Sequence, residues 1–199
     1  MKPVENIMRL FNQHGGMLRT RELYANKVFY NDIQQLAKDG FIEKVRYGYY
    51  QWIDADNPSE ARLISQLFPD AILAMDTALF YHGYSDRIPL AWHLAVSKDS
   101  SKSRFKIDYP FLRPYFIEPA LLECGISAGE IDGNPVRIYD KERTICDCMR
   151  YRNKMDREIY VKAIQGYVND TSKNIPRMMV YAKQLRVSDA VKNIVGVWL

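Results

Sequence analysis

The chain has 199 residues, of which 47% are hydrophobic and 26% are charged. This composition is ordinary for a globular protein and supplies enough apolar side chains for one large core or two small ones. No apolar run reaches the ~20 residues that a membrane-spanning helix needs, and the N-terminus lacks a signal-peptide pattern, so we expect a cytoplasmic protein with no membrane partner.

The formal net charge of +4 is unevenly distributed along the chain. Residues 1–55 carry +2, residues 56–136 carry −4, and residues 137–199 carry +6. Asymmetry of this kind favours a polyanionic partner, although lysine and arginine also cover many solvated helices. The charge pattern is therefore compatible with nucleic-acid binding and does not require it.

The N-terminal residues predict two helices with a short strand between them. Apolar residues spaced as on one helix face predict a first helix, and His14-Gly15-Gly16 ends it. Met17-Leu18 is short enough to be a brief strand that pairs with a later hairpin. Thr20 is expected to cap a second helix over residues 21–25 through its hydroxyl group. Asn26-Lys27-Val28 then makes a turn into a third helix.

Residues 29–53 predict a helix that runs into a two-stranded hairpin. One helix face is apolar and contains Phe29, Ile33, Leu36 and Ala37. Asp39-Gly40 ends the helix, since glycine is favoured where the chain leaves a helix with positive φ. Two β-rich runs follow, residues 41–46 and 49–53, and Tyr47-Gly48 between them is a two-residue hairpin signal.

The expected register of this hairpin gives it two different faces. If Arg46 faces Tyr49, then Val45 pairs with Tyr50 and Glu43 with Trp52. One face would then be apolar, and the other would carry Lys44, Arg46, Tyr49 and Gln51, with Tyr47 at the tip. A basic and aromatic face suits a sugar-phosphate backbone. An ordinary solvated surface hairpin is the alternative.

This order of elements is that of a winged helix-turn-helix, whose second helix enters the DNA major groove by its N-terminal end. Arg19, Thr20 and Arg21 are expected at a helix N-terminus, where amides and side chains hold phosphate. Asn31 and Gln34 match the donor and acceptor of an adenine edge. The full predicted DNA-binding set is Arg19, Thr20, Arg21, Lys27, Tyr30, Asn31, Gln34, Lys38, Lys44, Arg46, Tyr47 and Tyr49. The negative charge of Asp32 would repel phosphate. Asp32 could instead cap the helix or accept a hydrogen bond from cytosine.

We place a domain boundary after residue 55, which gives a domain of residues 1–55 and one of residues 56–199. Asn57 as N-cap and Pro58 at the first helical position predict a new helix. Strand patterns follow, including residues 92–97 and a hairpin around Asp132-Gly133-Asn134. Four helices are expected at the end of the chain, over residues 141–152, 157–168, 175–185 and 189–198. The fold class is therefore α+β, a winged helix-turn-helix followed by a larger α+β domain ending in a run of helices.

The sequence contains no clear catalytic or metal-binding motif. Its three cysteines form no CxxC pair, and no two histidines share a metal-ligand spacing. The most enzyme-like cluster is Glu142-Arg143-Thr144 with Asp147. Because Arg143 and Asp147 are four residues apart on one helix, a salt bridge at a helix start is favoured over a catalytic site. We therefore expect no enzyme activity, no cofactor and no metal.

Four segments, taken in order, resemble AbiEi-type antitoxins of abortive-infection, type IV toxin–antitoxin systems. They are His14–Leu23, Leu36–Tyr50, Asp76–Gly83 and Val136–Asp147, and together their order spans most of the chain. Tyr49-Tyr50 depart from the family pattern, in which an aliphatic residue precedes the tyrosine. This departure leaves open whether Tyr49 contacts DNA.

The resemblance implies a bacterial protein whose N-terminal domain represses its own operon by binding inverted repeats in promoter DNA. It also implies a C-terminal domain that counteracts a nucleotidyltransferase toxin, without requiring a stable complex with that toxin. Three alternatives remain: a winged-helix regulator with a ligand-sensing C-terminal domain, a defence nuclease or other enzyme, and a protein-interaction module whose wing binds protein.

Overall fold

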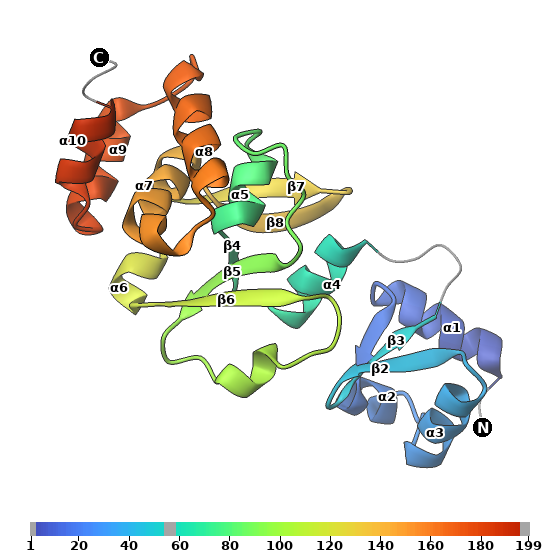
Figure 1. The fold of residues 1–199 in the computed structure, drawn as a ribbon. Helices are drawn as coiled ribbons and strands as arrows, with labels where there is room; N and C mark the ends of the chain where they lie inside the picture. The colour runs from blue at the N-terminus through green and yellow to red at the C-terminus, as the bar shows by residue number, and fades with distance from the viewer. Residues whose placement is uncertain (1–2, 54–58, 196–199) are drawn as a thin grey trace. The chain divides into compact units, whose positions relative to one another are not determined.

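The computed structural model describes residues 3–53 and 59–195 (Figure 1). These residues form an α+β protein with two sheets, and the chain divides into two compact units. The first unit extends to Pro69 and includes Ile107–Pro110, and the second contains Asp70–Lys106 and the chain from Phe111 onward. The expected boundary after residue 55 lies outside the described residues. None of the described helices has the length and apolar character needed to cross a membrane.

The first unit combines helices with a small antiparallel sheet. Its elements are α1 (Val4–Gln13), β1 (Met17–Arg19), α2 (Thr20–Ala25), α3 (Tyr30–Lys38), β2 (Ile42–Arg46), β3 (Tyr49–Trp52) and α4 (Glu60–Leu67). The strand order β1-β3-β2 confirms that the short strand at residue 17 pairs with the hairpin. Gly40 has a φ of 77° and follows α3, so the predicted end of that helix is confirmed.

The core of the first unit is formed by one apolar face from each of its first elements. Its buried members are Ile7, Phe11, Leu18, Leu23, Val28, Ile33, Leu36, Ile42 and Trp52. The spacing of Ile33 and Leu36 places both on the inner side of α3. Two residues predicted for this face lie outside the core, because Phe29 precedes the helix and Ala37 is exposed.

The hairpin register is confirmed at the turn and wrong beyond it. Arg46 pairs with Tyr49 as expected. A β-bulge between Lys44 and Arg46 then shifts β2 by one residue. The remaining pairs are Lys44–Tyr50, Glu43–Gln51 and Ile42–Trp52, in place of the expected Val45–Tyr50 and Glu43–Trp52.

The bulge changes which side chains share a face of the sheet. Directly paired residues project to the same side, and successive residues of a strand alternate. Lys44 therefore lies on the face of Tyr50, which packs against the core of the unit, and not beside Arg46. Arg46 and Tyr49 share the opposite face with Gln51, which is buried.

The second unit contains a mixed five-stranded sheet with the strand order β6-β5-β4-β8-β7. Its strands are β4 (Ile72–Leu73), β5 (Trp92–Ser97), β6 (Leu112–Ile117), β7 (Ile126–Ile131) and β8 (Asn134–Tyr139). The predicted strand over residues 92–97 and the hairpin around Gly133 are confirmed. The hairpin is antiparallel, whereas β5 and β6, and β4 and β8, run parallel.

The helices of the second unit lie mostly in its C-terminal half. They are α5 (Met75–Tyr81), α6 (Pro119–Leu122), α7 (Lys141–Tyr151), α8 (Arg157–Asn169), α9 (Ile175–Gln184) and α10 (Ser188–Val195), with short 3-10 turns at Lys102–Phe105 and Arg152–Lys154. The four predicted C-terminal helices are confirmed to within a few residues, up to the last described residue. The short α6 was not predicted, and the predicted caps Asn57 and Pro58 lie outside the described residues.

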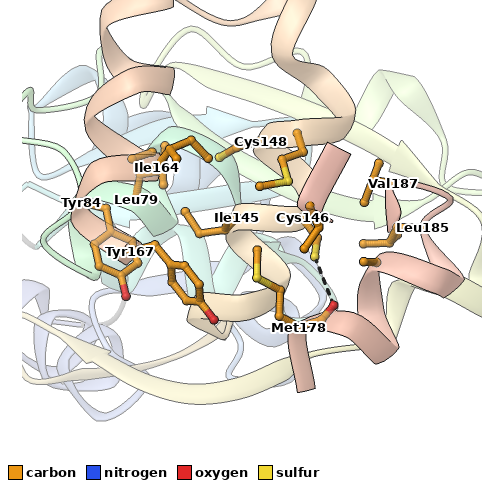
Figure 2. Packing of buried hydrophobic residues seen from close by; sticks show 14 of the residues in the cluster. Leu79, Tyr84, Ile145, Cys146, Cys148, Ile164, Tyr167, Met178, Leu185 and Val187 are labelled. Carbon is orange, nitrogen blue, oxygen red and sulfur yellow. Dashed lines mark hydrogen bonds between the residues drawn. The ribbon is translucent and has the colours of Figure 1, made fainter. Parts of the chain in front are cut away.

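Helix α7 is the centre of the helical core in the second unit. Figure 2 shows its buried Ile145, Cys146 and Cys148 among side chains from α5, α8 and α9. The Cys146 thiol is 3.7 Å from the Met178 carbonyl oxygen, to which it donates. Both α7 cysteines are free and buried, which is typical of structural thiols, and burial raises the pKa of each.

Candidate nucleic-acid interface

The twelve residues predicted to contact DNA fall into two groups by exposure. Eight are exposed on the first unit: Arg21, Lys27, Tyr30, Asn31, Gln34, Lys38, Lys44 and Tyr47. Four are only partly accessible: Arg19, Thr20, Arg46 and Tyr49. The exposed group comes from α2, α3, the turn between them and the hairpin. The two groups also differ in the contacts that their polar atoms make within the first unit.

Helix α3 presents a polar outer face because its apolar face is buried in the core. Ile33 and Leu36 are at most 1% exposed, whereas Asn31 and Gln34 are exposed one turn apart. Gln35 donates to both carboxylate oxygens of Asp39, at 2.8 and 3.0 Å. The Asn31 and Gln34 amides make no hydrogen bond within the described part of the chain. Their donors and acceptors are therefore available to a ligand.

Carboxylates that would repel DNA are engaged at the helix starts. Asp32 accepts from the Phe29 backbone amide at 3.0 Å, and Glu22 accepts from the Arg19 amide at 2.7 Å. Such bonds satisfy amides at a helix start and place negative charge at the positive end of the helix dipole. Asp32 thus caps α3, which was one of its two expected roles.

The same bonds correct the expected phosphate site at the start of α2. Thr20 was expected as N-cap, but Arg19 holds that position and the helix begins at Thr20. The Arg19 amide is bonded to Glu22, and the Thr20 amide donates to the Gly48 carbonyl at 2.9 Å. Neither amide is left to bind phosphate, whereas the Arg21 side chain is exposed at this position.

The turn between α2 and α3 displays Lys27 to solvent. Lys27 has a φ of 58°, and its amide donates to the Tyr24 carbonyl at 2.9 Å. The next residue, Val28, is buried in the core and anchors the turn. The backbone therefore holds the exposed lysine immediately before the N-terminal end of α3.

Arg46 is not a free cation on the hairpin. Its guanidinium carbon lies 3.9 Å from the centre of the Tyr49 ring and 5.4 Å from that of Phe68. Its Nη2 atom donates to the Leu67 carbonyl at 3.3 Å. Arg19 lies over Tyr49 at 5.2 Å, so Tyr49 contacts two guanidinium groups. The end of α4 thus covers part of the face that was expected to lie freely against DNA.

The exposed cation of the hairpin is Lys44. Its Nζ atom lies 5.5 Å from the centre of the Tyr47 ring, and Tyr47 is 91% exposed at the hairpin tip. A single weak contact of this kind leaves the lysine free to move to a phosphate. The hairpin therefore offers one exposed cation and one exposed aromatic ring.

Aromatic side chains from α2, from the start of α3 and from the hairpin interact with one another, and we call them the tyrosine cluster. It consists of Tyr24, Phe29, Tyr30, Tyr47 and Tyr50. The Tyr24 and Phe29 rings are 6.0 Å apart. Burial raises the pKa of the Tyr50 phenol, and the neighbouring phenols of Tyr24, Tyr30 and Tyr47 raise it further. Tyr24, Phe29 and Tyr50 are not among the predicted DNA-binding residues, and their proximity to Tyr30 and Tyr47 depends on the tertiary fold.

The enzyme-like cluster of the second unit is a buried ion pair. Arg143 and Asp147 are confirmed as an i, i+4 salt bridge, with Nε and Oδ2 3.0 Å apart and side-chain exposures of 0% and 2%. Arg143 also donates to the carbonyls of Leu121 and Cys124, at 2.7 and 2.6 Å. Gly125 leaves the room for this arrangement, since a Cβ there would lie 2.5 Å from that of Arg143.

The neighbouring acidic and histidine side chains also bond within the second unit. Glu142 accepts from the Asn174 amide at 2.8 Å, and His82 is 2.8 Å from the Tyr139 carbonyl. His93 is buried, and its Nδ1 is 3.3 Å from the Tyr115 hydroxyl. In the described residues, no group of three or more His, Cys, Asp and Glu side chains is placed to hold a metal ion.

Comparison with known proteins assigns no family to this arrangement. No protein-family model matches the chain, and a search of curated proteins gives no significant match.

Proposed function

We propose that the first unit is a winged helix-turn-helix that binds double-stranded DNA. In this proposal α3 lies in the major groove, and the β2–β3 hairpin lies along the backbone. The observation that carries the proposal is the outer face of α3, where the Asn31 and Gln34 amides are exposed and unbonded within the described chain. Exposed amides one turn apart are suited to base edges.

The exposed cations around α3 support the same proposal. Lys27 precedes the helix, Lys38 lies in its last turn, and Arg21 and Lys44 belong to the neighbouring elements. Cations arranged around a reading helix neutralise phosphates and fix its orientation, whereas the base contacts supply sequence preference. Arg46 is assigned a supporting role, because it holds Tyr49 and the end of α4.

The proposed biological role is repression of the protein's own operon, combined with antitoxin activity of the second unit against a nucleotidyltransferase toxin. This part is supported by the resemblance of four segments to AbiEi-type antitoxins, and it assigns no catalytic step to the chain. Co-expression with a neighbouring nucleotidyltransferase tests it. Rescue of growth by the full chain, and by a variant that no longer binds DNA, is the expected result. Unrelieved toxicity contradicts the antitoxin role.

Fluorescence anisotropy of the full chain with a duplex from its own upstream region tests DNA binding. Asn31→Ala and Gln34→Ala are expected to weaken binding to that duplex and to leave binding to random duplex nearly unchanged. Lys183→Ala is the matched control, because Lys183 is an exposed cation on α9 of the second unit. Equal losses on both duplexes would reassign the amides to backbone contacts, and absence of binding to either would contradict the proposal.

A further inference from the structure

The exposed side chains at the start of α3 restrict which base pairs the proposed DNA-binding unit can read. From Tyr30 to Gln34 the exposed residues are Tyr30, Asn31 and Gln34. Guanine is usually read by arginine or lysine, and none of these three is a cation. Asn and Gln amides match the N6 and N7 atoms of adenine, and apolar surface matches the methyl group of thymine.

The Asp32 and Gln35 side chains beside these residues are each engaged in hydrogen bonds within the unit. Asp32 could accept from cytosine, but its Oδ2 atom accepts from the Phe29 amide at 3.0 Å. The Gln35 amide is held by Asp39. Within α3, two amides and one aromatic ring therefore remain at the N-terminal end, which is the end that enters the groove in this class of protein. The exposed Lys27, in the turn before the helix, is assigned to phosphate as above.

Tyr30 is placed to bring apolar surface to a base edge. Its side chain is 61% exposed at the first position of α3, next to Asn31. Its phenol is close enough to that of Tyr50 on β3 to contribute to the raised pKa of Tyr50. A ring held at this position can pack on a methyl group that projects into the major groove.

We propose that this unit selects A·T-rich duplex DNA, with the Asn31 and Gln34 amides bonding adenine edges and the Tyr30 ring packing on thymine methyl groups. This inference rests on the proposed function, because it names the base pairs that the same surface reads. It assigns Tyr30 to sequence preference, whereas the sequence analysis listed Tyr30 among the DNA-binding residues without naming the group that it contacts.

The test begins with selection of duplexes from a random library by the full chain. A·T-rich duplexes are the expected product. The best duplex is then remade with deoxyuridine for thymidine, which removes only the methyl groups, and separately with 7-deazaadenine, which removes the adenine N7 acceptor. Loss of affinity of about fourfold is expected for each contacted methyl group, from the burial of one carbon. Loss of about tenfold is expected for an adenine contact bonded at two atoms.

Variants separate the base contacts from general effects on folding. Tyr30→Ala should bind the thymidine and deoxyuridine duplexes equally, whereas Tyr30→Phe should keep the preference for thymidine. Phe111→Ala is the matched control, since Phe111 is an exposed ring of the second unit, and it should also keep that preference. The affinity of Asn31→Ala should not fall when 7-deazaadenine replaces adenine at one or more positions.

The outcomes distinguish this inference from the proposed function. Selection of G·C-rich duplexes, or equal affinity for thymidine and deoxyuridine duplexes in the unmodified chain, would overturn the A·T inference and leave DNA binding in place. Failure to retain any duplex at low salt would overturn both.

Discussion

Arg46 and Tyr49 face each other across the β2–β3 hairpin, with the guanidinium carbon 3.9 Å from the centre of the ring. The same guanidinium donates to the Leu67 carbonyl. Arg46 therefore connects the hairpin to the end of α4, and its positive charge is partly used within the first unit. Lys44, two residues earlier, is exposed.

This difference predicts that substitutions at Lys44 and at Arg46 have different effects on the salt dependence of DNA binding. Lys44→Ala should flatten the slope of log affinity against log salt by about 0.9, as loss of one phosphate contact requires. Arg46→Ala should leave the slope unchanged. Anisotropy titrations between low and moderate salt measure both slopes. A flattened slope for Arg46→Ala would show that this guanidinium reaches phosphate.

Arg46→Ala should instead reduce stability. Loss of the contact with Tyr49 and of the bond to Leu67 is expected to cost about 1 kcal/mol, since the guanidinium is only partly buried. Urea denaturation followed by tyrosine and tryptophan fluorescence provides the measurement. Lys44→Ala is the control, and its free energy of unfolding should stay within about 0.5 kcal/mol of that of the unmodified chain.

The buried Arg143–Asp147 pair predicts a large effect in the second unit. Asp147→Ala removes one partner and leaves the Arg143 charge uncompensated, which should cost about 3–5 kcal/mol of unfolding free energy. Replacement of both partners by apolar residues, Arg143→Met with Asp147→Leu, should cost less than the single change. A double variant that is less stable than Asp147→Ala would contradict this. It would show that the bonds of Arg143 to the Leu121 and Cys124 carbonyls contribute more to stability than the charge pair does.

Burial of His93 predicts a pH dependence of stability. Burial disfavours the charged ring and lowers the pKa of His93 to about 4. Because the unfolded chain then binds the proton more readily than the folded one, the contribution of His93 is fully present above about pH 6.5 and is lost as the pH falls. Between pH 7 and pH 5 this loss should reach about 2 kcal/mol.

Thermal or urea unfolding at several pH values checks this contribution, with His93→Gln as the comparison. The variant should be less sensitive to pH between 7 and 5. Burial also raises the pKa of the adjacent Asp76, and a raised carboxyl pKa gives the opposite dependence of stability on pH. An unchanged pH dependence in His93→Gln would assign the effect to other groups, including His82, whose pKa burial also lowers.

Much of the fold follows from local patterns, and the deviations have physical causes. Ile33 and Leu36 fix the inner face of α3, and Gly40 fixes its end, because periodicity and positive φ are local properties. The bulge beside Arg46 was not predictable, because an extra residue in a strand changes no composition signal. Phe29 looked like a core residue by spacing, but it precedes the helix and is 56% exposed.

The candidate site was predictable in its exposed part and not in its covered part. Asn31, Gln34 and Lys44 are polar residues on amphipathic elements, so sequence alone places them on the surface. The partial burial of Arg46 depends on Leu67 and Phe68, which are about twenty residues away in the chain. Long-range packing of this kind leaves no signal in the local sequence.

The salt dependence of duplex binding by the unmodified chain tests the central claim most directly. With Arg21, Lys27, Lys38 and Lys44 each neutralising one phosphate, log affinity should fall against log salt with a slope of about −3 to −4 per chain. Fluorescence anisotropy with a duplex from the upstream region gives this slope. Absence of binding at low salt, or affinity that does not change with salt, would contradict a DNA-binding first unit.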